Sequence, residues 1–129
     1  TGREIKGLPP KYRVALGTDE TNVVVVAQYA LAKDVSKVKK TALAVAVERS
    51  ARALARALKG TPPKASKTTM GDLPATQFQF ETKSGSLTTR LVYAFQGKTQ
   101  YFVRCQWDDA GKDAIPAACD QVVKTLKPA

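Results

Sequence analysis

Histidine is absent from this chain, and cysteine, methionine and tryptophan are scarce. The lack of histidine removes the commonest general base, the commonest metal ligand and every histidine-containing catalytic triad. No apolar run approaches the roughly 18 residues that a membrane-spanning helix needs. The 129 residues, 43% of them hydrophobic, are enough for one core and argue against disorder. With no convincing pair of nucleophile and base either, we expect a single domain that is not an enzyme.

Acidic residues are outnumbered, 11 against 21 basic ones, which gives a net charge of +10. Residues 33–67 hold ten of the basic residues against two acids, whereas residues 105–123 carry four aspartates against one lysine. Such asymmetry selects anionic partners: nucleic acid, lipid headgroups, cell-envelope polymers or an acidic protein. A basic surface that serves only solubility is the alternative.

Alternating and helical hydrophobic periods divide the chain into eight elements. Strands are predicted at 12–16, 23–30, 65–70, 76–81, 87–95 and 101–107, and helices at about 36–59 and 115–126. Tight turns between the late strands imply antiparallel pairing. The prediction is an α+β domain at residues 11–129, in the order β-β-α-β-β-β-β-α, after a lead-in at residues 1–10. One long and one short helix are expected to cover one face of the sheet as a second layer.

The long helix is predicted to be amphipathic, with an irregular start because Val35 and Val38 fall off its apolar stripe. The stripe itself consists of Leu43, Val47, Ser50, Ala51, Leu54 and Leu58. A basic face lies opposite, made of Arg49, Arg52, Arg56 and Lys59. This face is our candidate binding surface for an acidic partner, and a solvated helix side is the alternative.

The two cysteines, Cys105 and Cys119, are either unrelated buried thiols or one disulfide. Cys105 is in phase with the apolar face of the last strand, and Cys119 with that of the last helix. Both sulfurs would then point into one seam, so we expect a bond that closes a loop of about 15 residues and contributes roughly 3 kcal/mol. Such a bond indicates an oxidising, extracytoplasmic compartment. The start at Thr1, without Met or an apolar leader, is what removal of a targeting segment would leave.

Two further clusters of side chains could bind a metal ion or nucleic acid. Asp108, Asp109 and Asp113 could attract calcium, but their spacing does not match an EF-hand, and a solvated loop is favoured. Three residues of the late strands could together stack and pair with nucleic acid: Arg90, Phe102 and Arg104. No RNA-recognition signature accompanies them, so nucleic acid is a disfavoured partner. No catalytic residue, metal or cofactor is expected.

Three local patterns carry a resemblance to a known group. They are GDLPA at 71–75 leading into Phe78 and Phe80, the double hairpin at 86–107, and VVKTL at 122–126. With the element order, they resemble the PsbP-like fold, in particular the LpqN-type lipoproteins and secreted proteins of actinobacteria, over roughly residues 11–127. The resemblance implies an antiparallel sheet flanked by helices, a cysteine in the last strand and another in the last helix, and export. It also implies a binding or assembly role without catalytic residues; the very basic long helix is a departure.

The expected function is therefore a non-enzymatic, extracytoplasmic binding or assembly domain, secreted or attached to the cell envelope. Its expected partner is a protein or an anionic envelope component, and an upstream lipid anchor would add peripheral membrane association. The alternatives are carriage of a small ligand or lipid between sheet and helix, or nonspecific binding of polyanions such as nucleic acid. A small enzyme is the least supported alternative. The oligomeric state and the biological process stay open.

Overall fold

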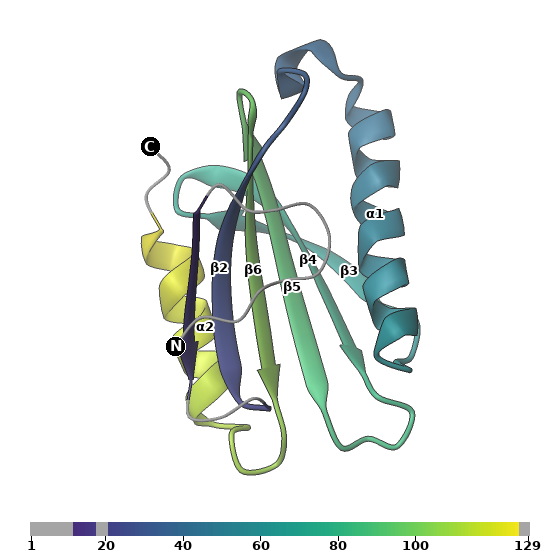
Figure 1. Cartoon of the computed structure of the whole chain (residues 1–129), viewed down its shortest axis with the longest axis vertical. Helices are drawn as coiled ribbons and strands as arrows, with labels where there is room; N and C mark the ends of the chain where they lie inside the picture. Colours follow the sequence, from purple (N-terminus) through teal and green to yellow (C-terminus); the bar gives the residue numbers. More distant parts are fainter. Residues whose placement is uncertain (1–11, 18–20, 127–129) are drawn as a thin grey trace.

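The computed structural model describes residues 12–17 and 21–126 of the chain. The lead-in predicted at residues 1–10 lies outside these ranges. The strands are β1 (Tyr12–Gly17), β2 (Val23–Ala30), β3 (Lys64–Met70), β4 (Leu73–Glu81), β5 (Thr88–Gln96) and β6 (Thr99–Trp107). The helices are α1 (Lys40–Ala57) and α2 (Ala114–Thr125), with a short 3-10 helix, η1 (Val35–Lys37), before α1. The predicted element order and α+β class are confirmed (Figure 1).

Within the described residues, six strands form one sheet in the order β1-β2-β6-β5-β4-β3, and every neighbouring pair is antiparallel. The chain leaves β2 for α1, returns at the far edge with β3, and fills the sheet inward by hairpins to β6. Edge strand β3 is largely exposed and carries Lys64 and Lys67, which discourage pairing with another chain.

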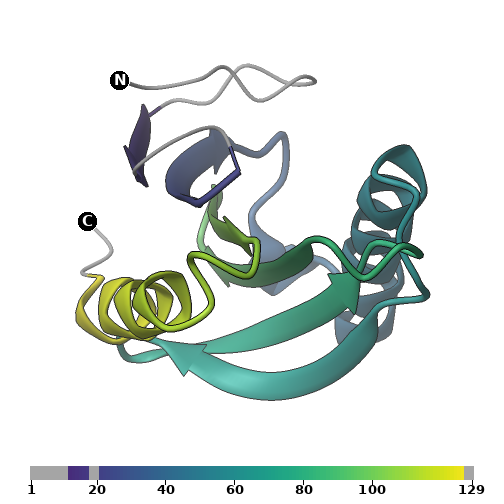
Figure 2. The same cartoon turned by 90° about the horizontal axis from the view of Figure 1, so that it is seen from below.

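The two helices lie on opposite faces of the sheet, so the expected single helical layer on one face is wrong (Figure 2). The core on one face joins Val92 and Val103 to α2, and the core on the other joins Leu91 and Phe102 to α1. The physical reason is that β5 and β6 are apolar in both phases, as strands between two covered faces must be.

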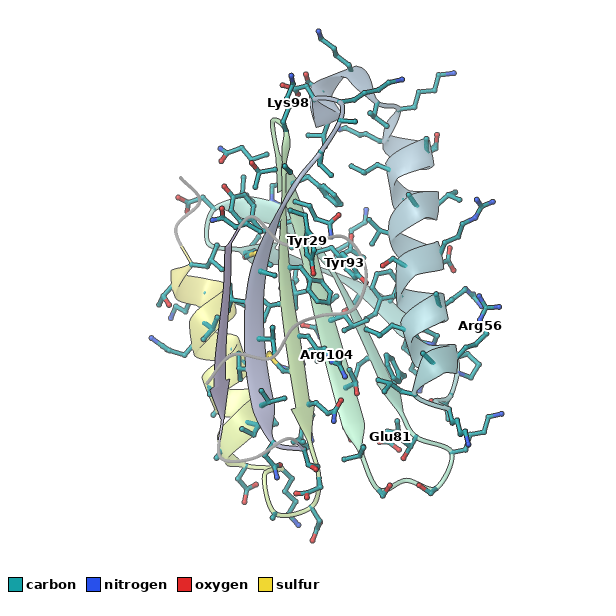
Figure 3. The ribbon with its side chains drawn as sticks, in the orientation of Figure 1. Tyr29, Arg56, Glu81, Tyr93, Lys98 and Arg104 are labelled. Carbon is teal, nitrogen blue, oxygen red and sulfur yellow. A yellow bond between two sulfur atoms is a disulfide. The ribbon has the colours of Figure 1, made fainter. Side chains whose placement is uncertain are left out.

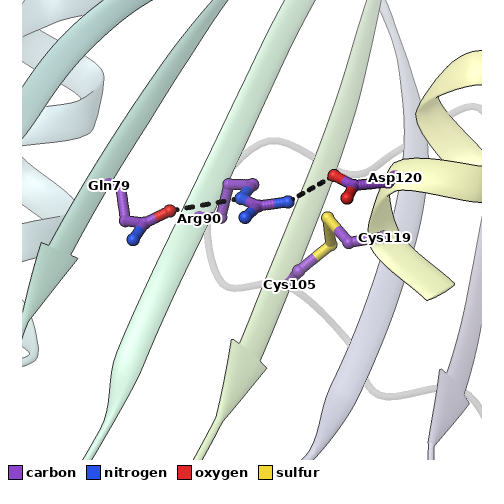
Figure 4. A network of polar contacts seen from close by, with 5 residues as sticks. All are labelled: Gln79, Arg90, Cys105, Cys119 and Asp120. Carbon is purple, nitrogen blue, oxygen red and sulfur yellow. Dashed lines mark hydrogen bonds and ion pairs between the residues drawn. A yellow bond between two sulfur atoms is a disulfide. The ribbon is translucent and has the colours of Figure 1, made fainter. Parts of the chain in front are cut away.

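The α2 face is closed by the predicted bond: Cys105 of β6 and Cys119 of α2 form a disulfide, and both residues are fully buried. Beside it, the Arg90 guanidinium donates to Asp120 at 2.7 Å and to Gln79 at 3.2 Å (Figure 4). The same guanidinium lies 5.4 Å from the centre of the Trp107 ring. Covalent, ionic and apolar contacts therefore all hold α2 against the sheet.

The α1 face is packed more sparsely. Only three of the 18 residues of α1 are buried, Val47, Ala51 and Ala55, and two of these are alanines. They meet the aromatic residues of β4, β5 and β6, where Tyr93 and Phe102 approach with ring centres 5.0 Å apart. Small residues at the contact and large ones beside it leave the helix spaced from part of the sheet.

The start of α1 is irregular, as expected. Val38 and Lys39 are extended, with ψ angles of 136°, and separate η1 from the first turn of α1. The loop before η1 is tied to the β5–β6 turn, because the Leu31 and Val35 amides donate to the carbonyls of Lys98 and Gly97, each at 2.8 Å. This tie fixes the position at which α1 begins above the sheet.

Candidate functional site

The predicted basic face lies on the outer side of α1. Arg49, Arg52, Arg56 and Lys59 are all exposed, and Arg56 points away from the sheet (Figure 3). Arg52 is held by Glu48 one turn earlier, at 3.0 Å. Arg49 and Arg56 have no ion pair among the described residues, so their charges are free to meet a partner from solvent. Arg49, Arg52 and Arg56 lie along α1, whereas Lys59 follows the end of the helix at Ala57. None of the four residues lines the two cavities beside α1 that are described below.

The arginine and aromatic trio considered for nucleic acid is not assembled, and that hypothesis is corrected here. Arg90 is directly paired with Cys105 and shares the α2 face, whereas Arg104 is paired with Leu91 and shares the α1 face. Phe102 is only 5% exposed and belongs to the α1 core. No common stacking surface exists between these residues.

Arg104 is instead a largely buried cation. Its Nη2 donates to Gln106 at 2.9 Å, and its Nε is buried with no hydrogen-bond partner among residues 12–17 and 21–126. Burial lowers the pKa of the Arg104 guanidinium from its ordinary value.

Two aspartates of the β6–α2 loop, Asp108 and Asp109, form contacts within the loop. The Asp108 carboxylate accepts from the amides of Ala110 and Gly111, at 2.9 and 3.3 Å, and Asp109 pairs with Lys112 at 3.4 Å. This agrees with the favoured reading of the cluster as a solvated, structured loop.

An apolar groove runs between α1 and the sheet. It consists of two cavities of about 500 and 350 Å³ that share Leu31, Ser50, Tyr93 and Gln100 in their walls. Each volume is within the range of about 300–1,000 Å³ that is typical of small-molecule sites. We call the two cavities together the α1 groove.

The helix wall of the α1 groove is a single row of short side chains. The row consists of Ala46, Ser50, Ala53 and Ala57, spaced by three and four residues along α1. Leu43 and Leu54 border it on the side nearer the core. All four residues are exposed, so the row packs little against the sheet.

The sheet wall is built from the aromatic residues of three strands. Tyr29 of β2, Tyr93 of β5 and Phe102 of β6 line the larger cavity, and Phe95 lines the smaller one. Tyr29 and Tyr93 lie between the sheet and α1 in Figure 3. These residues share the α1 face because the strand register places Ala27 opposite Phe102 and Tyr93 opposite Phe102.

A hydrogen bond crosses the groove where the two cavities meet. The hydroxyls of Ser50 and Tyr93 lie 3.1 Å apart. Burial raises the pKa of the Tyr93 phenol above its ordinary value of 10.0, although the bond to Ser50 opposes the shift. Tyr93 is thus a neutral hydroxyl at physiological pH, suited to orienting a ligand and not to exchanging a proton with it.

Sequence reasoning did not find the groove. The alanines of its helix wall are predicted only to favour helix formation on the flank of an amphipathic helix. The aromatic residues of its strands are predicted to be part of the hydrophobic core. The one available signal was that Ser50, a polar residue, fell on the apolar stripe together with leucines. A small polar residue in that stripe indicates that the helix does not press on the sheet there.

The comparisons with known proteins bear on the fold. The chain is an α+β domain of one antiparallel sheet with a helix on each face, and no family model matches it. No curated protein matches either. Among solved structures, it is similar to a Pseudomonas aeruginosa crystal structure described as "Protein of Unknown Function PA94" and "Putative Regulator", with a TM-score of 0.65 at 15% identity. The match covers 96% of this chain and 88% of that one, and it shows a shared fold.

None of the helices in the described residues has both the length and the apolar character required to cross a membrane.

Proposed function

We propose that this chain is a non-enzymatic binding domain that acts outside the cytoplasm and holds an apolar ligand in the α1 groove. The observation that carries the proposal is the groove itself: two adjoining cavities of about 500 and 350 Å³, walled by alanine, leucine and aromatic side chains. Apolar cavities favour apolar occupants, because water inside them finds few hydrogen-bond partners. A fold that spaces a helix from its sheet along a row of alanines forgoes core packing that bulkier side chains would supply.

The chemistry of the groove supports a binding role. Its polar groups are the hydroxyls of Tyr29, Ser50 and Tyr93 and the amide of Gln100, with Lys33 at one end. Hydroxyl and amide groups orient a ligand, but none of them is a general base near neutral pH. The raised pKa of Tyr93 keeps that phenol protonated as well.

The disulfide supports the extracytoplasmic part of the proposal. A buried bond between Cys105 and Cys119 is consistent with an oxidising environment such as the bacterial cell envelope. Secretion, lipid attachment and membership of the LpqN-type group stay predictions, since a fold shared at 15% identity does not assign a family.

A second candidate function is docking of an acidic protein or envelope polymer on the basic outer face of α1. The observation that favours it is the exposure of the Arg49 and Arg56 guanidiniums, neither of which forms an ion pair within the part of the chain that the structure describes. Reversal of both charges, as Arg49→Glu with Arg56→Glu, would abolish such docking and leave the groove intact. The two candidates are therefore separable by mutation.

Binding of the neutral dye Nile red tests the groove. Wild-type protein should enhance the fluorescence of the dye saturably, and Ala53→Trp should weaken its affinity at least about tenfold, because the indole fills the larger cavity. Ala44→Trp, an exposed position on the same helix outside the groove lining, is the matched control and should bind as wild type does. Equal binding by all three proteins, or none by the wild type, would refute the proposal.

A further inference from the structure

A charged side chain lines only one of the two cavities of the α1 groove, because Lys33 is in the wall of the smaller one. The smaller cavity lies toward the start of α1 and is lined by Lys33, Val35 and Val38, whereas the larger one extends to Ala57. From this polarity, and resting on the proposed binding function, we infer that the ligand is a single-chain anionic amphiphile. Its alkyl tail lies along α1, and its anionic head lies among the lysines at the start of the helix.

The start of α1 concentrates positive charge. Four lysines lie close to this point in the sequence: Lys33, Lys37, Lys39 and Lys40. Lys98 joins them from the β5–β6 turn, which is tied to the loop before η1 and lies at the same end of the molecule (Figure 3). Asp34 is the one acid among residues 31–43, and its carboxylate accepts from the amide and the hydroxyl of Ser36, at 2.9 and 2.7 Å. Five ammonium groups are therefore balanced by a single carboxylate, and that carboxylate already accepts hydrogen bonds from Ser36.

The helix dipole adds to this charge. Lys39 is the N-cap of α1 and provides no side-chain cap hydrogen bond, and the first turn contains no acidic residue. The positive end of the dipole and the lysines repel one another, which is the reverse of the usual placement of acids at a helix start. An anion bound at this end of the groove would relieve the repulsion and would meet unsatisfied backbone amides.

The dimensions of the groove fit one alkyl chain. The residues of α1 that line the groove extend from Leu43 to Ala57, about 21 Å at the rise of an α-helix. One leaflet of a bilayer, the length of a lipid tail, measures about 15 Å. The row of small side chains on α1 is one residue wide, which matches a single tail lying along it.

An alkyl chain also fits the groove better than a peptide does. An extended peptide brings an amide and a carbonyl at nearly every residue, and each needs a hydrogen-bond partner when it is buried. Among the described residues, the groove walls supply four uncharged polar side chains, and two of these, Ser50 and Tyr93, already bond to each other. A tail without polar atoms leaves no group unsatisfied.

Calorimetric titration with three 12-carbon amphiphiles below their micelle concentrations tests the inference. Dodecanoate should bind at least about tenfold more tightly than dodecyltrimethylammonium, with dodecanol between them, and added salt should reduce the difference. Across the 8-, 10- and 12-carbon acids, affinity should rise by about fourfold for each added methylene group. The variant Lys33→Gln with Lys37→Gln should lose the preference for dodecanoate, whereas Lys64→Gln with Lys67→Gln on β3, the matched change of charge, should keep it.

Failure of this inference is distinguishable from failure of the proposed function. If all three amphiphiles bind equally and Ala53→Trp blocks them, the groove holds apolar ligands but the assignment of an anionic head is wrong. If none of them binds but Nile red does, only the inference falls; if neither the amphiphiles nor Nile red bind, both proposals fall. Binding to anionic lipid vesicles or to an apolar 15-residue peptide, without uptake of free dodecanoate, would also overturn the inference in favour of a membrane surface or a protein segment.

Discussion

Tyr93 is the residue whose ionisation links the groove to the stability of the fold. Its phenol is buried, and burial raises its pKa above the ordinary value of 10.0. Because the unfolded chain releases this proton at a lower pH than the folded chain does, the contribution of Tyr93 to stability is complete below pH 10 and declines as the pH rises above it.

Replacement of Tyr93 tests this linkage. Tyr93→Phe should lower the free energy of unfolding at pH 8 by about 1 kcal/mol, because the hydrogen bond to Ser50 is lost. The variant should also lose less stability than the wild type between pH 8 and pH 11. Urea unfolding followed by circular dichroism at the two pH values measures both effects.

Ser50→Ala is the control for Tyr93→Phe. It removes the same hydrogen bond but leaves the phenol buried, so it should keep the alkaline loss of stability in full. If Tyr93→Phe and Ser50→Ala lost stability in parallel from pH 8 to pH 11, burial of Tyr93 would not be the cause.

The elements differ in how firmly they are held, and α2 depends on its disulfide. The bond joins residues 14 positions apart, and its removal in Cys105→Ala with Cys119→Ala should lower the free energy of unfolding by about 3 kcal/mol. Hydrogen exchange should then accelerate in α2 before it does in α1 or the sheet. Denaturant titration and amide exchange measure the two effects.

A reduced wild-type sample separates the bond from the side chains. It should unfold at nearly the same denaturant concentration as the double alanine variant, and a stability equal to that of the oxidised protein would contradict the chain-entropy account. A thiol count on freshly isolated, denatured protein under non-reducing conditions should find none of the two thiols free. Two free thiols would remove the support for an oxidising compartment.

Prediction of the elements from sequence succeeded where the hydrophobic residues followed one clear period, that of a strand or that of a helix. Cys105 and Cys119 were placed in one seam because each lies in phase with its own apolar neighbours, and the disulfide confirms it. The placement of both helices on one face failed because only one phase of each late strand was weighed. Val92 and Ala94 alternate with Leu91 and Tyr93 along β5, and all four are buried, which is the signal for two covered faces.

At the scale of the whole molecule, the α1 groove could not be predicted from the sequence. The α1 groove arises where Ser50 and Ala53 of α1 face Tyr29 of β2 and Tyr93 of β5, and these positions come together only through the sheet order. Alanines on a helix flank have the same pattern whether a sheet or open space lies opposite. The basic face could be predicted because periodicity alone defines it, and its role as a binding surface stays a prediction.

The claim that ligands bind between α1 and the sheet is tested most directly by titrating isotope-labelled protein with dodecanoate and following amide chemical shifts. The account predicts saturable shifts at Leu31, Ser50 and Tyr93, which line both cavities, and unchanged positions at Cys119 and Asp120 of α2. Shifts confined to α2 or to the outer arginines of α1, or no shifts at concentrations that saturate the calorimetric signal, would contradict it.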